Sequence, residues 1–411
     1  MDFAMRSYPK LYLTPKGERA ARKGHPWVFG EEVTKIEGKY ANGDLVDVVT
    51  PKGKYLGTGF VNDASKIRVR IISTNTNDKF DEAFWERRLR YALNYRLTVM
   101  GPTDFCCCRL IFGEADQFPG LTVDRFNDLL VTQTLSLGME QRKQTIFELL
   151  LRILGDMGQK IRGIYERNDV KIRRLEGMEE GKGWFLSELT PEPGVPITEI
   201  TENGIHYTVD VENGQKTGFF LDQKYNRQAV AKLARGKHVL DCFTHTGSFA
   251  LNAAQGGAAS VTAVDISAEA VQMAEHNALL NGYDKVVRGL QANVFDLLNE
   301  LLEKHSKEYD FIILDPPAFT KSGSTVAAAT RGYKEINLKA MKLLPRGGYL
   351  ATCSCSHFMK EELFVQMLED AAADAGISLR QIEARQQGPD HPILWNVPET
   401  NYLKFYLFQI V

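Results

Sequence analysis

Apolar and polar positions alternate in two distinct patterns along the chain, and the clearer one lies in the C-terminal half. Five short apolar runs predict strands, at 238–241, 260–265, 285–291, 311–315 and 348–352. Segments with helical periodicity predict helices at 247–255, 268–281, 294–304, 331–344 and 360–375. This alternation predicts an α/β domain over 201–411 with a mixed, mostly parallel sheet, whose ligands bind at the carboxyl ends of its strands.

The N-terminal half carries shorter β-type runs between turn signals. Runs at 45–49, 55–61 and 67–72, with turns such as Asn42-Gly43, predict a small β barrel or sandwich over 1–73. The polar stretch 75–81 is typical of a linker. A central α+β domain is then expected over 82–200. Its predicted helices lie at 82–99 and 140–157, and its predicted strands at 109–112, 120–125, 129–135 and 163–166. A further strand at 205–211 leads into the α/β domain.

Composition is that of a soluble globular protein, with 44% hydrophobic and 25% charged residues. No apolar run reaches the roughly 18–20 residues that span a bilayer, and the start MDFAMRSYPK lacks the apolar stretch of a signal peptide. We therefore expect a cytoplasmic protein without membrane contact. The six cysteines form no C-x-x-C spacing, so neither a metal site nor a disulfide framework is predicted.

Candidate ligand-binding residues stand at the ends of four predicted strands. Asp241 opens a tight loop to Gly247, where a helix begins, but the loop is not the G-x-G-x-x-G of dinucleotide folds. Asp265 follows the second strand and can accept hydrogen bonds from ribose hydroxyls. Asn293 follows the third strand and could bond an adenine edge, and Asp315 follows the fourth. This order favours an amino-acid-bearing nucleoside such as S-adenosylmethionine (SAM).

The motifs Asp241–Gly247, Val264-Asp265, Asn293 and Leu314–Phe319 resemble those of class I SAM methyltransferases, which have a Rossmann-like fold. Together with 214–223, 352–356 and 390–392, they make nearly the whole chain similar to the ribosomal RNA large subunit methyltransferase I family. The resemblance implies a PUA domain, a central α+β domain and a methyltransferase domain, in that order. The candidate cofactor residues are Phe219, Gln223, Asp241, Phe243, Thr246, Gly247, Ser248, Asp265, Ile266, Asn293, Val294, Asp315 and Pro316. For Phe219, plain core packing is the alternative.

A cysteine pair follows the fifth predicted strand, in Thr352-Cys353-Ser354-Cys355-Ser356. Carbon C5 of a pyrimidine is a poor nucleophile, so its methylation uses a thiolate that first adds to C6. Both Cys353 and Cys355 are candidates for this nucleophile. The family resemblance favours Cys355, whereas Cys353 fits the pattern of another group of cytosine-C5 methyltransferases. The alternative is that both cysteines are buried and purely structural. Asp315 is expected to hold the N3 and amino edge of the base.

The main hypothesis is therefore a methyltransferase for C5 of a cytosine in large-subunit (23S-type) ribosomal RNA. A guanine-N methyltransferase of the same fold and a non-catalytic RNA-binding or assembly factor are the alternatives. Residues 1–73 hold 13 Lys+Arg and 8 Asp+Glu, which favours a polyanion partner. The sequence leaves the nucleotide position, the state of the RNA and the oligomeric state open, and a homodimer is compatible with it. The candidate RNA-binding residues are Lys16, Arg19, Arg22, Lys23, Trp27 and Arg331.

Overall fold

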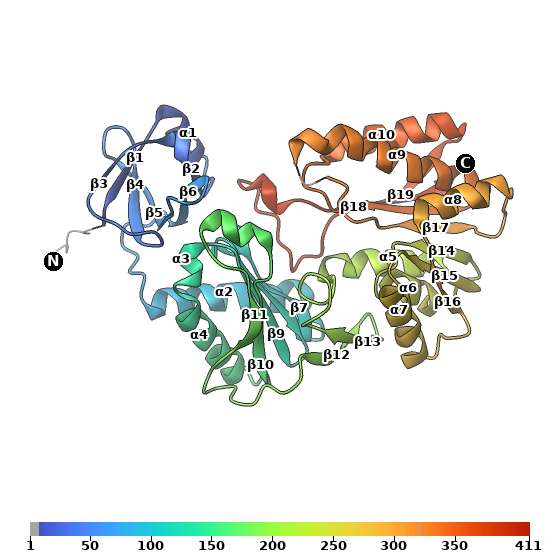
Figure 1. Cartoon of the computed structure of the whole chain (residues 1–411), viewed down its shortest axis with the longest axis horizontal. Coiled ribbons are helices and arrows are strands. Elements are labelled where there is room, and N and C mark those ends of the chain that lie inside the picture. Colours follow the sequence, from blue (N-terminus) through green and yellow to red (C-terminus); the bar gives the residue numbers. More distant parts are fainter. Residues whose placement is uncertain (1–7, 321) are drawn as a thin grey trace. The chain divides into compact units, whose positions relative to one another are not determined.

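The computed structural model describes residues 8–320 and 322–411, and the chain divides into two compact units (Figure 1). The first unit comprises 1–199, 209–220 and 389–400, and the second comprises 200–208, 221–388 and 401–411. The expected absence of a signal peptide concerns mostly residues 1–7, which lie outside the described residues. Within the described ranges, no helix is both long and apolar enough to cross a bilayer. The division into three domains stays a prediction.

A six-stranded sheet at the N-terminus of the first unit has the strand order β2-β6-β5-β4-β1-β3. Its alternating apolar residues, such as Leu11, Leu13, Val46 and Val48, form a closed core of their own. The sequence patterns missed three short strands and helix α1, whose N-terminus is capped by Thr14. The elements are β1 (Lys10–Leu13), α1 (Pro15–Arg22), β2 (Trp27–Phe29), β3 (Val33–Glu37), β4 (Leu45–Val49), β5 (Tyr55–Val61) and β6 (Ile67–Ser73).

The rest of the first unit is built on a five-stranded sheet of order β11-β10-β9-β8-β7, with helices α2 and α4 in contact with each other. The predicted helix at 140–157 is shorter, because 137–140 forms a separate turn, α3. A hairpin, β12 (Ile197–Glu202) and β13 (Ile205–Asp210), follows. The other elements are α2 (Glu82–Met100), β7 (Cys107–Phe112), β8 (Leu121–Phe126), β9 (Leu129–Thr134), α3 (Leu137–Glu140), α4 (Lys143–Asp156), β10 (Gly163–Arg167) and β11 (Lys182–Phe185).

The second unit is a seven-stranded sheet of order β16-β15-β14-β17-β18-β20-β19. The first five of these are parallel, whereas β20 runs antiparallel to both β18 and β19, which confirms the mixed, mostly parallel sheet. Strands β14 to β16 follow one another toward one edge of the sheet, whereas β17 and β18 follow one another toward the other edge. Because the direction of strand succession reverses between β14 and β17, a ligand crevice is expected at the carboxyl ends of these two strands. The strands are β14 (His238–Cys242), β15 (Ser260–Asp265), β16 (Val287–Gln291), β17 (Phe311–Leu314), β18 (Tyr349–Ser354), β19 (Leu379–Arg385) and β20 (Lys404–Ile410).

Helices cover both faces of this sheet, with α5, α6 and α7 on one side and α8, α9 and α10 on the other (Figure 1). The prediction that α9 begins at Arg331 is wrong: the helix begins at Val326, because the run Ala327–Ala329 has high helix propensity. Strand β18 also extends to Ser354, which places Cys353 inside the strand and Cys355 just beyond it. The helices are α5 (Lys224–Leu233), α6 (Ser248–Gln255), α7 (Ala268–Leu280), α8 (Val294–Glu303), α9 (Val326–Leu343) and α10 (Glu361–Ala375).

Candidate active site

The loop between β14 and α6 is held in an unusual backbone conformation around the buried Asp241. Phe243 and His245 both have positive φ, and so does Gly247, where an added Cβ would come within 2.9 Å of the Ala274 side chain. Asp241 Oδ2 accepts hydrogen bonds from the Thr244 hydroxyl at 2.6 Å and from the backbone N–H of Ala250 at 3.0 Å. The carboxylate therefore fixes both the loop and the start of the helix.

Three carboxylates interact at the carboxyl ends of neighbouring strands. The pKa of Asp241 is raised to about 7, mainly by burial and also by the charges of Asp315 and Asp265, while its two hydrogen bonds act in the opposite direction. Its Oδ1 is buried and has no hydrogen-bond partner among the described residues. An orphaned buried acceptor is costly. This edge of the sheet therefore favours a ligand that brings positive charge or N–H donors.

Asp265 and Asn293 both have structural duties at helix starts. Asp265 accepts from the backbone N–H of His245 and of Ser267, each at 3.0 Å. Asn293 Oδ1 accepts from the N–H of Phe295 at 2.9 Å and caps α8. Of the two neighbouring candidate cofactor residues, Ile266 is 68% exposed and Val294 belongs to the hydrophobic core. The ribose and adenine roles of these residues stay predictions.

Asp315 is oriented by a chain of polar contacts that runs back to β19. Gln223 Nε2 donates to Asp315 Oδ1 at 3.0 Å, and Asn226 Nδ2 donates to Gln223 Oε1 at 2.6 Å. Arg385 in turn donates to Asn226 Oδ1 at 3.3 Å. A side chain held in this way loses little freedom when a ligand binds, which is what a base-positioning group requires.

The two candidate nucleophiles differ sharply in their surroundings. Cys353 is fully buried in β18, and burial together with the nearby Asp315 raises its pKa well above the ordinary value. Cys355 follows the strand, is partly exposed, and has its Sγ 4.0 Å from the carbonyl oxygen of Pro316. Next to it, Ser356 donates to the carbonyl of Thr320 at 2.9 Å, so the two loops are joined. The thiol in Cys355 is thus the accessible one of the pair.

Sequence reasoning missed Lys404, which lies opposite Ser354 in the antiparallel pairing of β20 with β18. Its Nζ donates to the carbonyl of Ser356 at 2.6 Å and to that of Tyr402 at 2.8 Å, although the residue is only 6% exposed. Burial lowers its pKa to about 8, whereas the charges of Cys355 and Glu361 act to raise it. The only hint in the sequence was a lysine at the start of the otherwise apolar strand KFYLFQI.

The remaining predicted cofactor residues lie in several settings. Thr246 and Ser248 are buried at the start of α6, and the Thr246 hydroxyl has no hydrogen-bond partner among the described residues. Pro316 is buried, and the ring of Phe243 lies 6.4 Å from that of Phe319. Phe219 is buried in the first unit, and its cofactor role stays a prediction.

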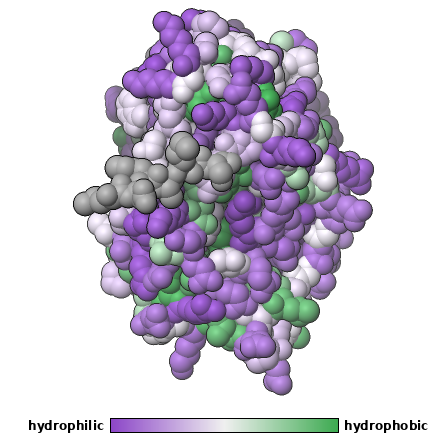
Figure 2. Space-filling view, turned by 90° about the vertical axis from the view of Figure 1, so that its left-hand side faces the viewer, coloured by the Kyte–Doolittle hydropathy of each residue, from purple (hydrophilic) through white to green (hydrophobic). Residues whose placement is uncertain are grey.

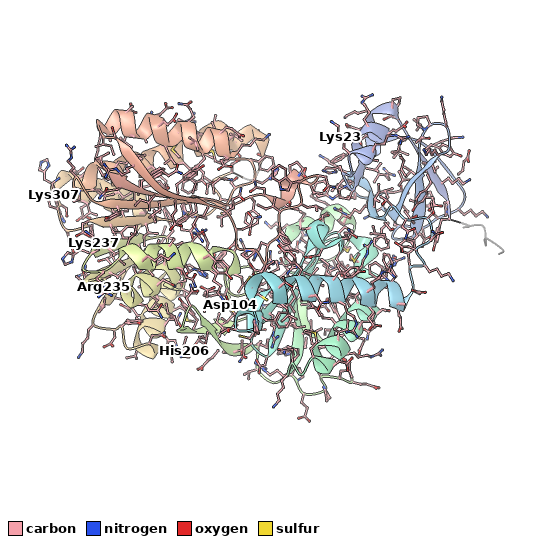
Figure 3. All side chains as sticks on the ribbon, turned by 180° about the vertical axis from the view of Figure 1, so that it is seen from behind. Lys23, Asp104, His206, Arg235, Lys237 and Lys307 are labelled. Atoms are coloured by element: carbon pink, nitrogen blue, oxygen red, sulfur yellow. The ribbon has the colours of Figure 1, made fainter. Side chains whose placement is uncertain are left out.

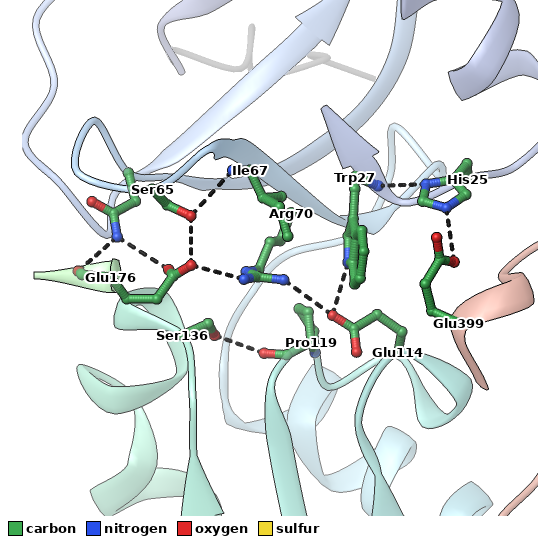
Figure 4. A network of polar contacts seen from close by, with 11 residues as sticks. His25, Trp27, Ser65, Ile67, Arg70, Glu114, Pro119, Ser136, Glu176 and Glu399 are labelled. Atoms are coloured by element: carbon green, nitrogen blue, oxygen red, sulfur yellow. Dashed lines mark hydrogen bonds and ion pairs between the residues drawn. The ribbon is translucent and has the colours of Figure 1, made fainter. Parts of the chain in front are cut away.

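The predicted RNA-binding residues are not equally accessible. Lys16 is paired with Glu31 at 3.0 Å and Arg22 with Glu18 at 2.8 Å. Trp27 is half-buried, and its indole N–H donates to Glu114 at 2.9 Å (Figure 4). Arg331 is exposed on α9 in the second unit. Arg19 and Lys23 are exposed on and just after α1, where Figure 3 labels Lys23.

Comparison with known proteins agrees with this architecture. A family model described as S-adenosylmethionine-dependent methyltransferase matches residues 185–409, and one described as a PUA-like domain matches 11–74. Ribosomal RNA large subunit methyltransferase I of Klebsiella pneumoniae (strain 342) is 38% identical over 98% of this chain and 99% of its own length. The chain belongs to the ribosomal RNA large subunit methyltransferase I family. The protein of that name from Aeromonas hydrophila is 41% identical, over 96% of this chain and 97% of its own.

Solved structures agree on the fold of this family member. A SAM-dependent methyltransferase from Streptococcus mutans superposes with a TM-score of 0.80 at 21% identity, covering 97% of this chain and 99% of its own. A methyltransferase complexed with SAH gives 0.81 at 20% identity, with the same coverage. These findings confirm the predicted methyltransferase fold with a PUA-like N-terminal domain, and they confirm SAM as the cofactor.

Proposed function

We propose that this protein methylates C5 of a cytosine in large-subunit ribosomal RNA through a covalent adduct with Cys355. The names of the full-length relatives support ribosomal RNA as the substrate. The observation that carries the proposed chemistry is the contrast among the three cysteines of the second unit: Cys242 and Cys353 are fully buried, whereas Cys355 is partly exposed beside Pro316. Thiol chemistry at this edge of the sheet therefore falls to Cys355.

The loop residues after β14 and β15 fit the cofactor. SAM supplies a methyl group on a positively charged sulfur and also carries an ammonium group. The unpartnered Oδ1 of Asp241, with Asp265 and Asp315 nearby, offers the negative charge that such a cation needs. Gly247 lets the backbone approach closely at the start of α6. We assign Asp241, Asp265 and this loop to cofactor binding.

Cys355 performs the step that makes C5 reactive. Its thiolate adds to C6 of the cytosine and forms the S–C6 bond, while the electron pair of the C5–C6 double bond moves to C5. After C5 has accepted the methyl group, a base removes the proton from C5, and the electrons of the S–C6 bond return to sulfur. The enzyme ends the cycle with its thiol unchanged.

Asp315 and Lys404 support this step in different ways. Asp315, which is oriented by Gln223, holds the N3 and amino edge of the cytosine in this proposal. Lys404 is a buried cation whose charge interacts with Cys355, and a nearby positive charge favours the thiolate over the thiol. Because a duplex hides both faces of a base, the cytosine must be unpaired or turned out of its helix. Arg19, Lys23 and Arg331 are our candidates for contact with the RNA backbone.

The test uses RNA in which cytidine is replaced by 5-fluorocytidine. Fluorine at C5 cannot leave as a proton does, so the adduct with Cys355 should persist as a complex that survives denaturing electrophoresis. Cys355→Ala should form no such complex and should lose at least about 1000-fold in methylation rate while still binding SAM, because only the covalent route would be lost. Cys353→Ala is the matched control and should keep the adduct.

Mass spectrometry of ribosomal RNA from a deletion strain identifies the methylated atom independently. We expect 5-methylcytidine to be lost from one position and restored by the gene for the wild-type protein but not for Cys355→Ala. Full activity of Cys355→Ala would contradict the covalent mechanism and favour a nitrogen target. No change in ribosomal RNA methylation would contradict the substrate.

A further inference from the structure

A pocket of about 420 Å³ lies within the first unit, between the barrel and α2. This volume is within the range of small-ligand sites. The end of β6 (Ile71 to Ser73) and the segment after α1 form one wall, and Arg87, Arg88 and Tyr91 of α2 form another. The third side comes from far along the sequence: Leu394 and Asn396, in the 389–400 segment of the same unit.

Ion pairs and hydrogen bonds hold the walls of this pocket in fixed positions. Arg70 of the barrel lies between Glu114 at 3.3 Å and Glu176 at 2.8 Å, and Glu114 also accepts from Trp27 (Figure 4). The side chains of Arg70, Glu114 and Glu176 are largely buried, so these contacts are shielded from solvent. The pocket is therefore preformed, and a ligand would not have to assemble it.

The 389–400 segment is fastened near both ends. The backbone carbonyl of Asp390 accepts from the buried Arg96 at 2.9 Å, and its carboxylate accepts from the N–H of Arg109 at 2.9 Å. Near the other end, Glu399 contacts His25 at 3.2 Å (Figure 4). A loop anchored in this way presents the side chains between its anchors in a defined place.

One aromatic residue that lines this pocket and one that lies next to it in the 389–400 segment are exposed to an unusual degree. Tyr91 lines the pocket and is 67% exposed, and Trp395, between the two lining residues Leu394 and Asn396, is 95% exposed. Tryptophan is highly buried on average, and leaving its ring in water forfeits the hydrophobic gain of burial. Exposed aromatic rings on a rigid frame are the usual stacking surfaces for unpaired bases.

The charges around the pocket favour a polyanion. Arg87 and Arg90 are exposed on the same helix as Tyr91, and Arg19 and Lys23 are exposed on and next to α1. The acidic residues that line the pocket are already engaged: Asp78 contacts Arg87 at 3.1 Å, and Glu114 contacts Arg70. The side of the barrel seen in Figure 2 is mainly hydrophilic, with apolar residues in small separate groups.

We propose that Tyr91 and Trp395 form a second nucleotide site, in which an unpaired base of the RNA substrate stacks while Arg87 and Lys23 contact its phosphates. The inference rests on the proposed function only in taking RNA as the substrate. It assigns recognition of the RNA to helix α2 and to the 389–400 segment as well as to the barrel. Trp27, whose indole N–H is engaged with Glu114, is then part of the frame.

Equilibrium binding to RNA without SAM tests this site separately from methyl transfer. The probes are a fluorescein-labelled oligouridylate of about ten nucleotides and a fully paired RNA hairpin of equal length, and binding is followed by anisotropy. We expect Trp395→Ala to weaken oligouridylate binding about 10-fold, in line with the loss of one stacked base. Trp395→Phe should recover most of the affinity, and Tyr91→Ala should weaken binding in the same way. Leu186→Ala, which removes another exposed apolar side chain (82% exposed) of the first unit, is the matched control and should change nothing.

Trp395 also reports on its own occupancy, because a base stacked on the ring should quench its fluorescence. Quenching by the oligouridylate that disappears in Trp395→Ala supports the proposal. Wild-type affinity in both Trp395→Ala and Tyr91→Ala would overturn it, as would equal losses for the single strand and the hairpin, since a stacking site distinguishes them. A protein that binds RNA through this site but makes no 5-methylcytidine would contradict the proposed function and leave this inference intact.

Discussion

Replacing the buried Asp241 by asparagine should remove a large part of the pH dependence of the stability of the second unit. Asparagine has nearly the shape of a protonated aspartic acid but cannot ionise, so the variant imitates the neutral form at every pH. The side chain is fully buried, and its Oδ2 can keep accepting from Thr244 and Ala250 as an amide oxygen. The difference between the two proteins should therefore come mainly from the proton.

The magnitude follows from the pKa of about 7 against the ordinary value of 3.8. At 1.36 kcal/mol for each pKa unit, this difference corresponds to about 4 kcal/mol. Because the folded-state pKa of Asp241 is raised, its stabilising contribution is complete below pH 4. The contribution is then lost as the pH rises, because the unfolded chain ionises freely while the folded chain must keep the proton. Above about pH 7 the folded protein also ionises, and the loss stops.

Urea unfolding at pH values from 4 to 8 measures this effect. All four tryptophans lie in the first unit, so fluorescence follows that unit, whereas far-ultraviolet circular dichroism follows both. The free energy of unfolding of Asp241→Asn minus that of the wild type should rise by up to about 4 kcal/mol between pH 4 and pH 7. The fluorescence transition should show no such rise.

Binding of SAM provides a second measurement. A cation beside Asp241 favours its ionised form, so SAM binding near pH 6 should release a proton, seen by titration calorimetry in two buffers of different ionisation enthalpy. The variant should release none at this site. A stability difference that stays constant within about 1 kcal/mol over the whole pH range would refute the assignment of a proton to Asp241 in the folded protein.

Three further predictions test other parts of the structure. Lys404→Met should raise the pKa of the Cys355 thiol by about one unit or more, because a nearby positive charge is lost, whereas Lys404→Arg should leave this pKa unchanged. The pH profile of alkylation by iodoacetamide measures the pKa, and identical profiles for Lys404→Met and the wild type would exclude the interaction. Glu202→Gln removes the negative partner of the buried Arg227, so the free energy of unfolding of the second unit in urea should fall by about 3–5 kcal/mol. A decrease below about 1 kcal/mol would show that the ion pair contributes little to stability. Trp27→Phe should lower the stability of the first unit by about 1 kcal/mol through loss of one hydrogen bond, yet leave RNA affinity within twofold; a tenfold loss of affinity would restore Trp27 as an RNA contact.

The sequence by itself determined the alternation of strands β14 to β18 with helices α6 to α10 and the polar residues at the strand ends, whereas α5, β19 and β20 were not predicted. Both are local features, because the side-chain periods of helices and strands and the motif residues that follow them are written in consecutive positions. Asp241, Asp265 and Asp315 could therefore be assigned to one edge of the sheet before any contact was known, since parallel strands share their carboxyl edge. Short elements such as β1, β2 and α1 escaped because three to eight residues carry too little periodicity.

The tertiary structure alone decided which of these residues can act and what surrounds them. Cys353 is buried and Cys355 is partly exposed because β18 ends at Ser354, between the two cysteines. The pairing of β18 with β20 sets that boundary. The same antiparallel register brings Lys404 to the carbonyl of Ser356, 48 residues earlier in the chain. Trp395 is likewise held on the first unit by contacts of its neighbours with residues hundreds of positions away. Long-range pairing depends on how whole faces pack against one another, and no local pattern in a single chain records that register.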